Sequence, residues 1–480
     1  MSAATGAPGA LDRTGELLDR AVELVERSAG PGEEMEIYLA RGEETEIRAF
    51  EGDVESLSSA ASAGIGVRVI LGALADPEAR PGDGPGEAAD REGGRMGFAW
   101  AGSLEPDVVE ETIAAARDNA RFATPDPYVA LARPDGVPPA SLDVWRPSEL
   151  STDDKVSLAL ELERAVRHGD PRIRQVASAD YGDSSVEVGL ASSTGIRSWS
   201  RRTSAFVSVS AIAGQGADSQ TGTGFSAGRR GEELDLARAG SDALERALRM
   251  LGAKKAKSMR CTVVFDPRVV STLIAVIAGA LSGEAVVKGR SFLAERVGET
   301  VAAPEVTLVD DPTDPRAYGA SRYDGEGLAC RRNLLVDGGV LQGFLFDTVS
   351  ARRAGTESTG SAVRGGYSGG PGSGCRAMVL QPGGMTREEI LGAVGEGLYV
   401  QSVTGVHSGV NPISGDLSVG AEGLLIRGGE LAEPVREITV ASTLQRMLQS
   451  VAHIGSDVEW LPGVAAGQTL AVAEMQLSGA

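Results

Sequence analysis

A pattern of strands followed by a helix occurs twice in the first half of the chain. In the first copy, apolar and polar residues alternate over 35–39, and an amphipathic helix is predicted at 105–122. In the second copy, predicted strands over 185–213 precede a helix at 232–251. Such a recurrence predicts two related α/β units built from strand meanders and helices. Further strands are expected at 45–49, 64–71 and 96–101 in the first copy, and at 185–190, 196–200 and 203–213 in the second.

A proline-rich segment divides the two units. Residues 124–147 contain six prolines, which predict an extended linker over 124–150. The linker separates a first unit at 1–123 from a second at 151–255. Division is expected because 480 residues are too many for one compact core.

The second half of the chain has a different character. Short predicted strands and glycine turns such as Asp337-Gly338-Gly339 indicate a mainly antiparallel β domain at 256–480, with a few helices. Strands are expected at 261–265, 305–309, 332–336, 340–346, 424–427, 435–440 and 469–477, and helices at 268–289, 387–395 and 444–451.

Two segments have a composition that does not favour folding. Residues 1–10 lack the features of an export signal and are expected to form a disordered tail, while 76–94 are rich in proline, glycine and charge and predict a mobile surface insertion. No apolar run is long enough to span a bilayer. Cys261, Cys330 and Cys375 are widely spaced, so they are interpreted as reduced thiols of a cytoplasmic protein.

The charge of the chain limits its partners. With 46 Lys and Arg against 67 Asp and Glu, the formal charge is −21. The negative electrostatic potential of such a chain repels phosphate backbones and anionic lipids, so neither nucleic acid nor a membrane surface is an expected partner.

A mostly apolar run at 269–281 leads directly into Glu284 and Lys288. The run is too short to cross a bilayer and suits a buried helix. A carboxylate and an ammonium group at the edge of a core are costly unless they are paired or open to a cleft. An ion pair, a cleft or a former catalytic role would each account for them.

The histidines do not form a recognisable metal motif. Only His168, His407 and His453 are present, and no HExxH occurs. His168 and His453 are predicted near helix ends, where a surface or capping role is expected. His407 lies in a polar loop, the kind of segment on which functional residues concentrate.

A nucleophilic triad has little support in the sequence. His407, Ser408 and Asp416 supply its residue types, but a base adjacent in sequence to its nucleophile is poorly placed, and no GxSxG elbow occurs. A chance assortment is favoured. Cys375 precedes an arginine that could lower its pKa, although a small buried thiol is the default interpretation.

Four carboxylates fall close together at Asp310, Asp311, Asp324 and Glu326. Dense oxygen ligands could hold Ca²⁺ or Mg²⁺. Their spacing does not match an EF-hand loop, and Asp-Asp-Pro and Asp-Gly are ordinary turn sequences, so turns are favoured over a metal. The glycine-rich loop at 365–374 lacks the ending of a P-loop, so it does not indicate phosphate binding.

An ordered series of short motifs resembles the TldD/PmbA family of metallopeptidases over essentially the whole chain from about Glu33. The loop from His407 through Asn411 to Asp416 and Gly420 is similar to the PmbA branch, also called TldE. The motifs of the series are Gly283 to Leu293, Thr307 to Pro312, Tyr323 to Gly327, Leu335 to Leu341, Ser358-Thr359-Gly360 and Gln381-Pro382-Gly383.

The resemblance implies a zinc site in the TldD branch, held by the two histidines of HExxxH and a cysteine near the C-terminus, with the glutamate as general base. Laid on this sequence, the motif falls on Gly283, Glu284 and Lys288, and no cysteine follows Cys375. Glycine offers no donor atom, and a lysine ammonium has no lone pair and repels a dication. We therefore expect a vestigial motif, with no catalytic residue and no metal in this chain.

These observations predict a zinc-less PmbA/TldE-like subunit, inactive alone, whose TldD-like partner carries the zinc and cleaves unfolded or extended peptides. The partner is expected in a heterodimer, with self-association as a homodimer as the alternative. The peptide is expected to add as a strand to an exposed sheet edge. Residues expected to contact substrate or partner are Asp324, Glu326, His407, Ser408, Asn411 and Asp416.

Two other functions remain open. One is a stand-alone hydrolase whose site combines His407, Ser408 and Asp416 with the carboxylates Asp324 and Glu326. The other is a homodimeric protein that binds peptides without cleaving them.

Overall fold

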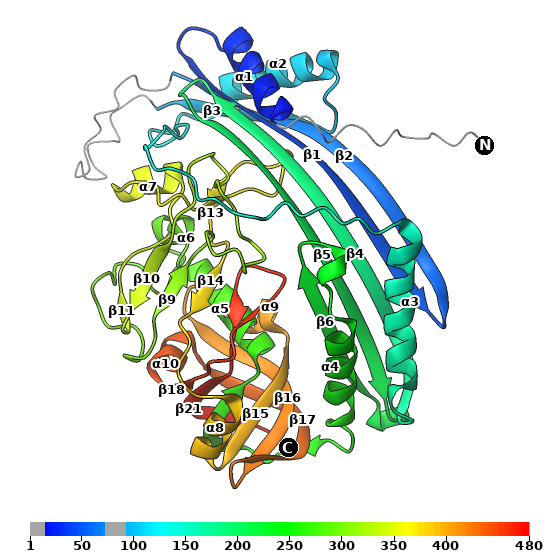
Figure 1. Cartoon of the computed structure of the whole chain (residues 1–480). Helices are drawn as coiled ribbons and strands as arrows, with labels where there is room; N and C mark the ends of the chain where they lie inside the picture. Colours follow the sequence, from blue (N-terminus) through cyan, green and yellow to red (C-terminus); the bar gives the residue numbers. More distant parts are fainter. Residues whose placement is uncertain (1–14, 73–92, 480) are drawn as a thin grey trace.

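A long, curved antiparallel sheet arches over the C-terminal part of the molecule (Figure 1). The computed structural model describes residues 15–72 and 93–479. The predicted tail at 1–10 lies outside the described residues. The predicted insertion at 76–94 does so too, except for Gly93 and Gly94. The strands of this sheet follow the order β3-β2-β1-β4-β5-β6. They span Glu33–Phe50 (β1), Asp53–Leu71 (β2), Arg95–Ala101 (β3), Ile173–Ser192 (β4), Arg197–Ala213 (β5) and Gln220–Gly228 (β6).

The predicted repeat is visible in the order of the elements. Each half of the sheet has a helix before its three strands and another after them. The two halves do not form separate sheets, because β1 and β4 pair over 14 residues. The four helices are α1 (Glu16–Ser28), α2 (Pro106–Phe122), α3 (Thr152–Gly169) and α4 (Leu236–Leu248).

Several strands are longer in the structure than the sequence predicted. The segments at 35–39 and 45–49 belong to the single strand β1, and those at 196–200 and 203–213 belong largely to β5. Strand β6 was missed because its glycines weaken the strand pattern. A Cβ at Gly224 would lie 1.8 Å from the carbonyl oxygen of Ala239, so glycine is needed for α4 to pack directly on β6.

The two faces of the sheet have different coverings. Met35, Ile37 and Leu39 of β1 face a core shared with α1 and α2. Tyr38 and Ala40, on the opposite face, pack with residues that include Leu328 of the C-terminal domain. Because both faces are covered here, residues 35–40 are all buried.

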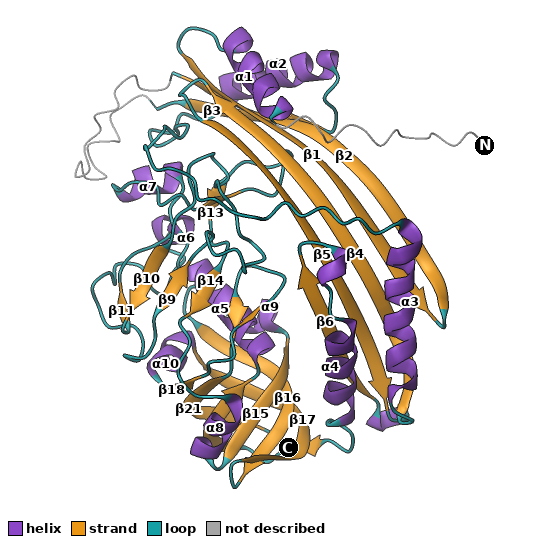
Figure 2. Cartoon of the chain, viewed as in Figure 1, coloured by secondary structure: helices purple, strands orange, loops and turns teal. Residues whose placement is uncertain are grey.

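The C-terminal domain is mainly antiparallel β structure (Figure 2). Its largest sheet has the order β18-β21-β8-β15-β16-β17-β7, and an additional β21–β17 pairing joins strands far apart in that order. Smaller sheets have the orders β11-β10-β9-β14, β12-β13 and β19-β20. The strands span Lys254–Lys255 (β7), Met259–Phe265 (β8), Leu308–Asp310 (β9), Asn333–Asp337 (β10), Val340–Leu341 (β11), Ala362–Val363 (β12), Gly372–Ser373 (β13), Met378–Leu380 (β14), Gly397–Thr404 (β15), Asp416–Arg427 (β16), Glu430–Thr443 (β17), Val451–Ile454 (β18), Glu459–Trp460 (β19), Ala466–Gly467 (β20) and Leu470–Ser478 (β21).

The long helix predicted at 268–289 is in fact two helices. The chain leaves the first helix at Leu281, and the backbone N–H of Gly283 donates to the carbonyl of Leu345 at 2.7 Å. This bond turns the chain before the short second helix. The helices of the domain are α5 (Pro267–Ala280), α6 (Gly283–Val287), α7 (Thr348–Ala354), α8 (Arg387–Val394), α9 (Val406–Gly409) and α10 (Leu444–Gln449). Within the described residues, no helix is long and apolar enough to cross a membrane.

Candidate functional site

Helix α6 carries Gly283 and Glu284 of the HExxxH-like motif and ends at Val287, just before Lys288. Two serines fix its start. The Ser282 and Ser373 hydroxyls are 2.8 Å apart, and the N–H of Glu284 donates to the Ser373 Oγ at 2.7 Å. Strand β13 therefore holds the first turn of α6 in place.

Glu284 and Lys288 form an ion pair, which is one of the three explanations that the sequence left open for their charges. Their side chains are 51% and 40% exposed, so the pair lies in solvent rather than in a core. An exposed pair one helical turn apart contributes at most about 0.5 kcal/mol. The two charges are thus accommodated by water and by each other.

Gly283 occupies a position with no room for a side chain. A Cβ placed there would lie 2.2 Å from the Cδ1 of Phe346 and 2.9 Å from the carbonyl oxygen of Leu345. Phe346 is itself buried. A histidine at this position would have to displace the aromatic ring and the adjoining backbone.

The His407 loop is on the surface. His407, Ser408, Asn411 and Asp416 are all exposed. The Ser408 hydroxyl donates to the carbonyl of Gly405 at 3.3 Å, and the Asn411 side chain accepts backbone bonds from within its own turn. Asp416 accepts from the Ser414 hydroxyl at 2.7 Å. Among the described residues, no hydrogen bond or ion pair joins His407, Ser408 and Asp416 into a triad.

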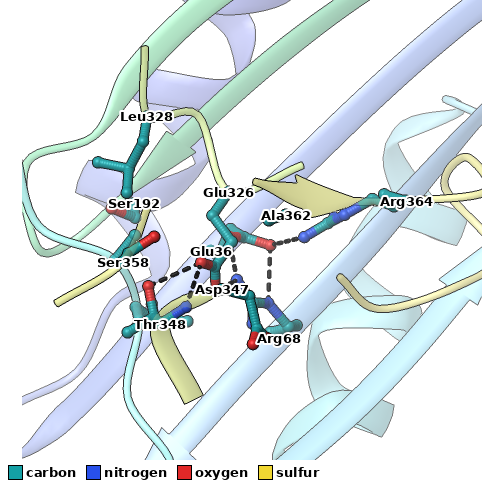
Figure 3. Close-up of polar contacts among 12 residues, drawn as sticks. Glu36, Arg68, Ser192, Glu326, Leu328, Asp347, Thr348, Ser358, Ala362 and Arg364 are labelled. Atoms are coloured by element: carbon teal, nitrogen blue, oxygen red, sulfur yellow. Dashed lines mark hydrogen bonds and ion pairs between the residues drawn. The ribbon is translucent and has the colours of Figure 1, made fainter. Parts of the chain in front are cut away.

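Charged residues from both parts of the molecule meet in a buried cluster (Figure 3). Glu36 of β1 accepts bonds from Arg68 of β2, with its Oε1 2.9 Å from the Arg68 Nε, and from Arg364 of the C-terminal domain at 2.5 Å. All three side chains are almost fully buried. Burial alone would raise the pKa of Glu36, but Arg364 and Arg68 lower it to about 2. Glu36 is therefore ionised and joins the two parts of the fold.

Glu326 lies beside this ion pair. Its Oε2 accepts from the backbone N–H and the hydroxyl of Thr348, at 2.9 and 2.7 Å. Its Oε1 has no hydrogen-bond partner, and the nearest cation, the Nη2 of Arg68, is 3.7 Å away. Burial raises the pKa of Glu326 to about 7, because Arg68 only partly offsets it and Asp324 and Asp347 add to the increase.

Asp324 has a turn role. Its Oδ1 accepts from the backbone N–H groups of Glu326 and Leu328, and its Oδ2 from that of Ala362. This pattern agrees with the turn interpretation of the sequence. Both oxygens of Asp324 accept backbone hydrogen bonds, and Glu326 is 0% exposed. Asp324 therefore stabilises the local backbone and Glu326 the interdomain contact, and neither presents a reactive group.

Glu36, Arg68 and Arg364 were not expected from the sequence. The alternation of apolar and polar residues over 35–39 predicts a strand with one buried face, but the C-terminal domain also covers the face that carries Glu36. A weak signal was present: Arg68 lies in the otherwise apolar strand sequence GIGVRVIL, where a buried cation needs a carboxylate partner.

The thiols are not poised for reaction. All three cysteines are free, and burial raises the pKa of Cys375 to about 12 and that of Cys261 to about 11. Neither is a thiolate at neutral pH.

Comparison with known families accounts for this architecture. Models for domain 1, the central domain and the C-terminal domain of the PmbA/TldA metallopeptidases match residues 35–120, 145–251 and 258–479. Together they cover most of the chain.

The chain belongs to the PmbA/TldD metallopeptidase family.

Relatives within the PmbA/TldD family are similar along most of their length. Metalloprotease PmbA from Escherichia coli O157:H7 is 28% identical over 388 residues, which are 80% of this chain and 83% of that protein. A PmbA homologue from Haemophilus influenzae is 26% identical over 81% of this chain and 84% of its own. The crystal structure of TldE from Thermococcus kodakarensis is 25% identical and superimposes with a TM-score of 0.83, covering 96% of this chain and 100% of that one.

The residues at the PmbA/TldD motif do not fit a zinc ion. Gly283 has neither a donor atom nor space for one, and Lys288 offers an ammonium already paired with Glu284. In the described part of the chain, no group of three or more His, Cys, Asp and Glu side chains is arranged to hold a metal. Glu284 alone cannot supply the ligands of a stable zinc site.

Glu326→Gln is expected to flatten the pH dependence of stability. An unfolded glutamate titrates near pH 4.3, whereas the folded pKa is about 7. The stability contributed by protonated Glu326 is therefore full below about pH 4 and is lost as the pH rises through about 7. The melting temperature of the variant should fall less than that of the wild type between about pH 5 and about pH 8.

Circular dichroism melts across this range measure the effect. Glu357→Gln, at an exposed glutamate, is the control and should keep the wild-type profile. Parallel profiles for wild type and Glu326→Gln would show that Glu326 is ionised throughout.

Proposed function

We propose that this chain is the zinc-less, PmbA/TldE-type subunit of a two-subunit peptidase in the cytoplasm. The zinc and the peptide cleavage belong to a TldD-like partner, and the substrates are unfolded or extended peptides. The observation that carries the proposal is the position of Gly283, where the first zinc-binding histidine would clash with Phe346 and the Leu345 carbonyl. The ammonium of Lys288, at the second histidine position, supports it further.

The outer half of β2 supports a partner chain. Residues 55–62 are exposed in an unbroken run, although they pair with β1 on one side. Strand β3 pairs only with residues 65–71, so among the described strands none covers the other edge of residues 53–62. An exposed edge with bare faces is a template for another chain. We assign this edge to the TldD-like partner.

Partner-dependent cleavage tests the proposal. The purified chain should not cleave an unfolded peptide alone, whereas a mixture with a TldD-like protein should cleave it faster than that protein alone. Leu57→Lys, on the exposed edge of β2, should weaken the complex, and Phe122→Lys, at a still more exposed residue at the end of α2, should not. Cleavage by the isolated chain that is lost on His407→Ala would instead favour a stand-alone hydrolase.

A stable homodimer that neither recruits a TldD-like chain nor supports cleavage would favour the peptide-binding alternative. Size-exclusion chromatography with light scattering, on the chain alone and in the mixture, separates these outcomes.

A further inference from the structure

A cavity of about 340 Å³ between β4, β5 and the C-terminal domain is lined by five arginines. We name it the arginine cavity; the arginines are Arg201, Arg202, Arg322, Arg364 and Arg376. The only carboxylate in its lining is that of Asp324, whose oxygens accept three backbone N–H groups. In a chain with a net charge of −21, this is a local reversal of sign.

Most of these guanidinium groups lack an anionic partner. Within residues 15–72 and 93–479, Arg364 alone among the five makes an ion pair with a carboxylate, that of Glu36. Arg201 lies 4.7 Å from the Trp145 ring centroid, and Arg322 donates to the carbonyl of Ala140. Neither contact neutralises charge.

Arg364 is held rigidly with donors to spare. Its side chain is 2% exposed, and its guanidinium lies 4.5 Å from the Tyr38 ring centroid. The Nη2 is bonded to Glu36, but the Nε and Nη1 are buried without a hydrogen-bond partner. An unsatisfied buried donor on a cation costs stability, and that cost is removed if the guanidinium turns to meet a ligand acceptor in the cavity.

Arg376 and Arg202 complete the set. The Nη2 of Arg376 donates to the carbonyl of Ala362 at 3.0 Å, while its Nε is buried without a partner. The Arg202 side chain makes no hydrogen bond or ion pair in the described part of the chain. Arg202 is exposed by its accessible surface, but the crowded walls of the cavity desolvate its guanidinium and lower its pKa, and repulsion from Arg376 lowers it further. Among the described residues neither Arg202 nor Arg376 forms an ion pair, so both cations are stabilised when an anion binds.

We propose that the arginine cavity binds the carboxylate group of an organic ligand. The planar guanidinium forks of Arg364, Arg376 and Arg202 match the two oxygens of a carboxylate. Tyr38, Val186 and Val188 supply an apolar wall for the body of the ligand. The carboxylate belongs either to the C-terminus of a short peptide or to a small free acid. Binding is a property of this chain alone and does not depend on the absence of zinc.

Calorimetric titration of the full-length chain tests the proposal with three probes: acetyl-trialanine as the free acid, the same peptide as its C-terminal amide, and succinate. If the ligand is a peptide end, the free acid binds and the amide does not. If the ligand is a small acid, succinate binds and both peptides fail. Either result supports carboxylate recognition, and raising the salt concentration should weaken it.

Arg202→Gln should weaken binding of the active probe roughly 10-fold to 100-fold, because one charge-assisted contact is lost. Without ligand, the variant should unfold at the same or a higher temperature than the wild type, because an unpartnered cation has been removed. Arg197→Gln, on the same strand but paired with Glu26 outside the cavity, is the control and should bind normally.

Three results would overturn the proposal. In the first, none of the three probes binds. In the second, the acid and amide peptides bind equally well and succinate does not bind. In the third, Arg202→Gln binds the active probe with the same affinity as the wild type.

Discussion

The Arg68→Ala variant is expected to lose about 3 to 5 kcal/mol of unfolding free energy. Arg68 donates to both oxygens of Glu36 and lies 3.7 Å from Glu326. Removing it leaves Glu36 with Arg364 as its only cation in the buried cluster, and leaves Glu326 with no cation nearby. Because these carboxylates are buried, water cannot replace the lost partner without opening the contact between the sheet and the C-terminal domain.

Urea unfolding of the full-length chain measures this change, with Arg48→Ala as the matched control. Arg48 lies on β1 and pairs with Asp180, but its side chain is 51% exposed, so the loss should stay below about 1 kcal/mol. Equal effects of the two substitutions would show that the buried cluster does not hold the domains together.

Gly283→Ala is expected to destabilise the protein by about 1 to 3 kcal/mol, as over-packing of a filled core does. The added methyl group would meet the Phe346 ring and the Leu345 carbonyl at distances well inside van der Waals contact. Gly279→Ala, near the end of α5, is the matched control because a Cβ there meets nothing within 4 Å. It should be neutral or stabilising by up to about 1 kcal/mol. Thermal unfolding of the two variants compares them directly.

The lack of room at residue 283 also bears on metal binding. Gly283→His combined with Lys288→His restores the letters of the motif but should not create a tight zinc site, because the first imidazole has no room and no cysteine follows Cys375. A well-folded double variant that binds zinc tightly would show that α6 can move away from Phe346.

The sequence predicted many of the helices and strands but not how the two halves of the molecule meet. Local patterns located α2 and α4, because an amphipathic stripe needs only its own neighbours. They could not identify Glu36 as buried, since its burial depends on a domain more than 200 residues away in the sequence. Arg364, in a glycine-rich loop, had no local pattern to indicate its ion pair with Glu36.

For the HExxxH-like motif, the identity of the residues was more informative than their helical spacing. The loss of imidazoles at 283 and 288 is visible in the sequence. The apolar residues at helical spacing over 268–289, however, predicted one continuous helix, whereas the structure has two, α5 and α6. The break arises from the bond between the Gly283 N–H and the Leu345 carbonyl, a contact between distant segments.

The zinc content of the purified full-length chain tests the central claim most directly. Elemental analysis after removal of loosely bound metal should find far less than one zinc per isolated chain, and about one per complex once a TldD-like partner is bound. One tightly held zinc per isolated chain, together with peptide cleavage that a chelator abolishes, would contradict the account.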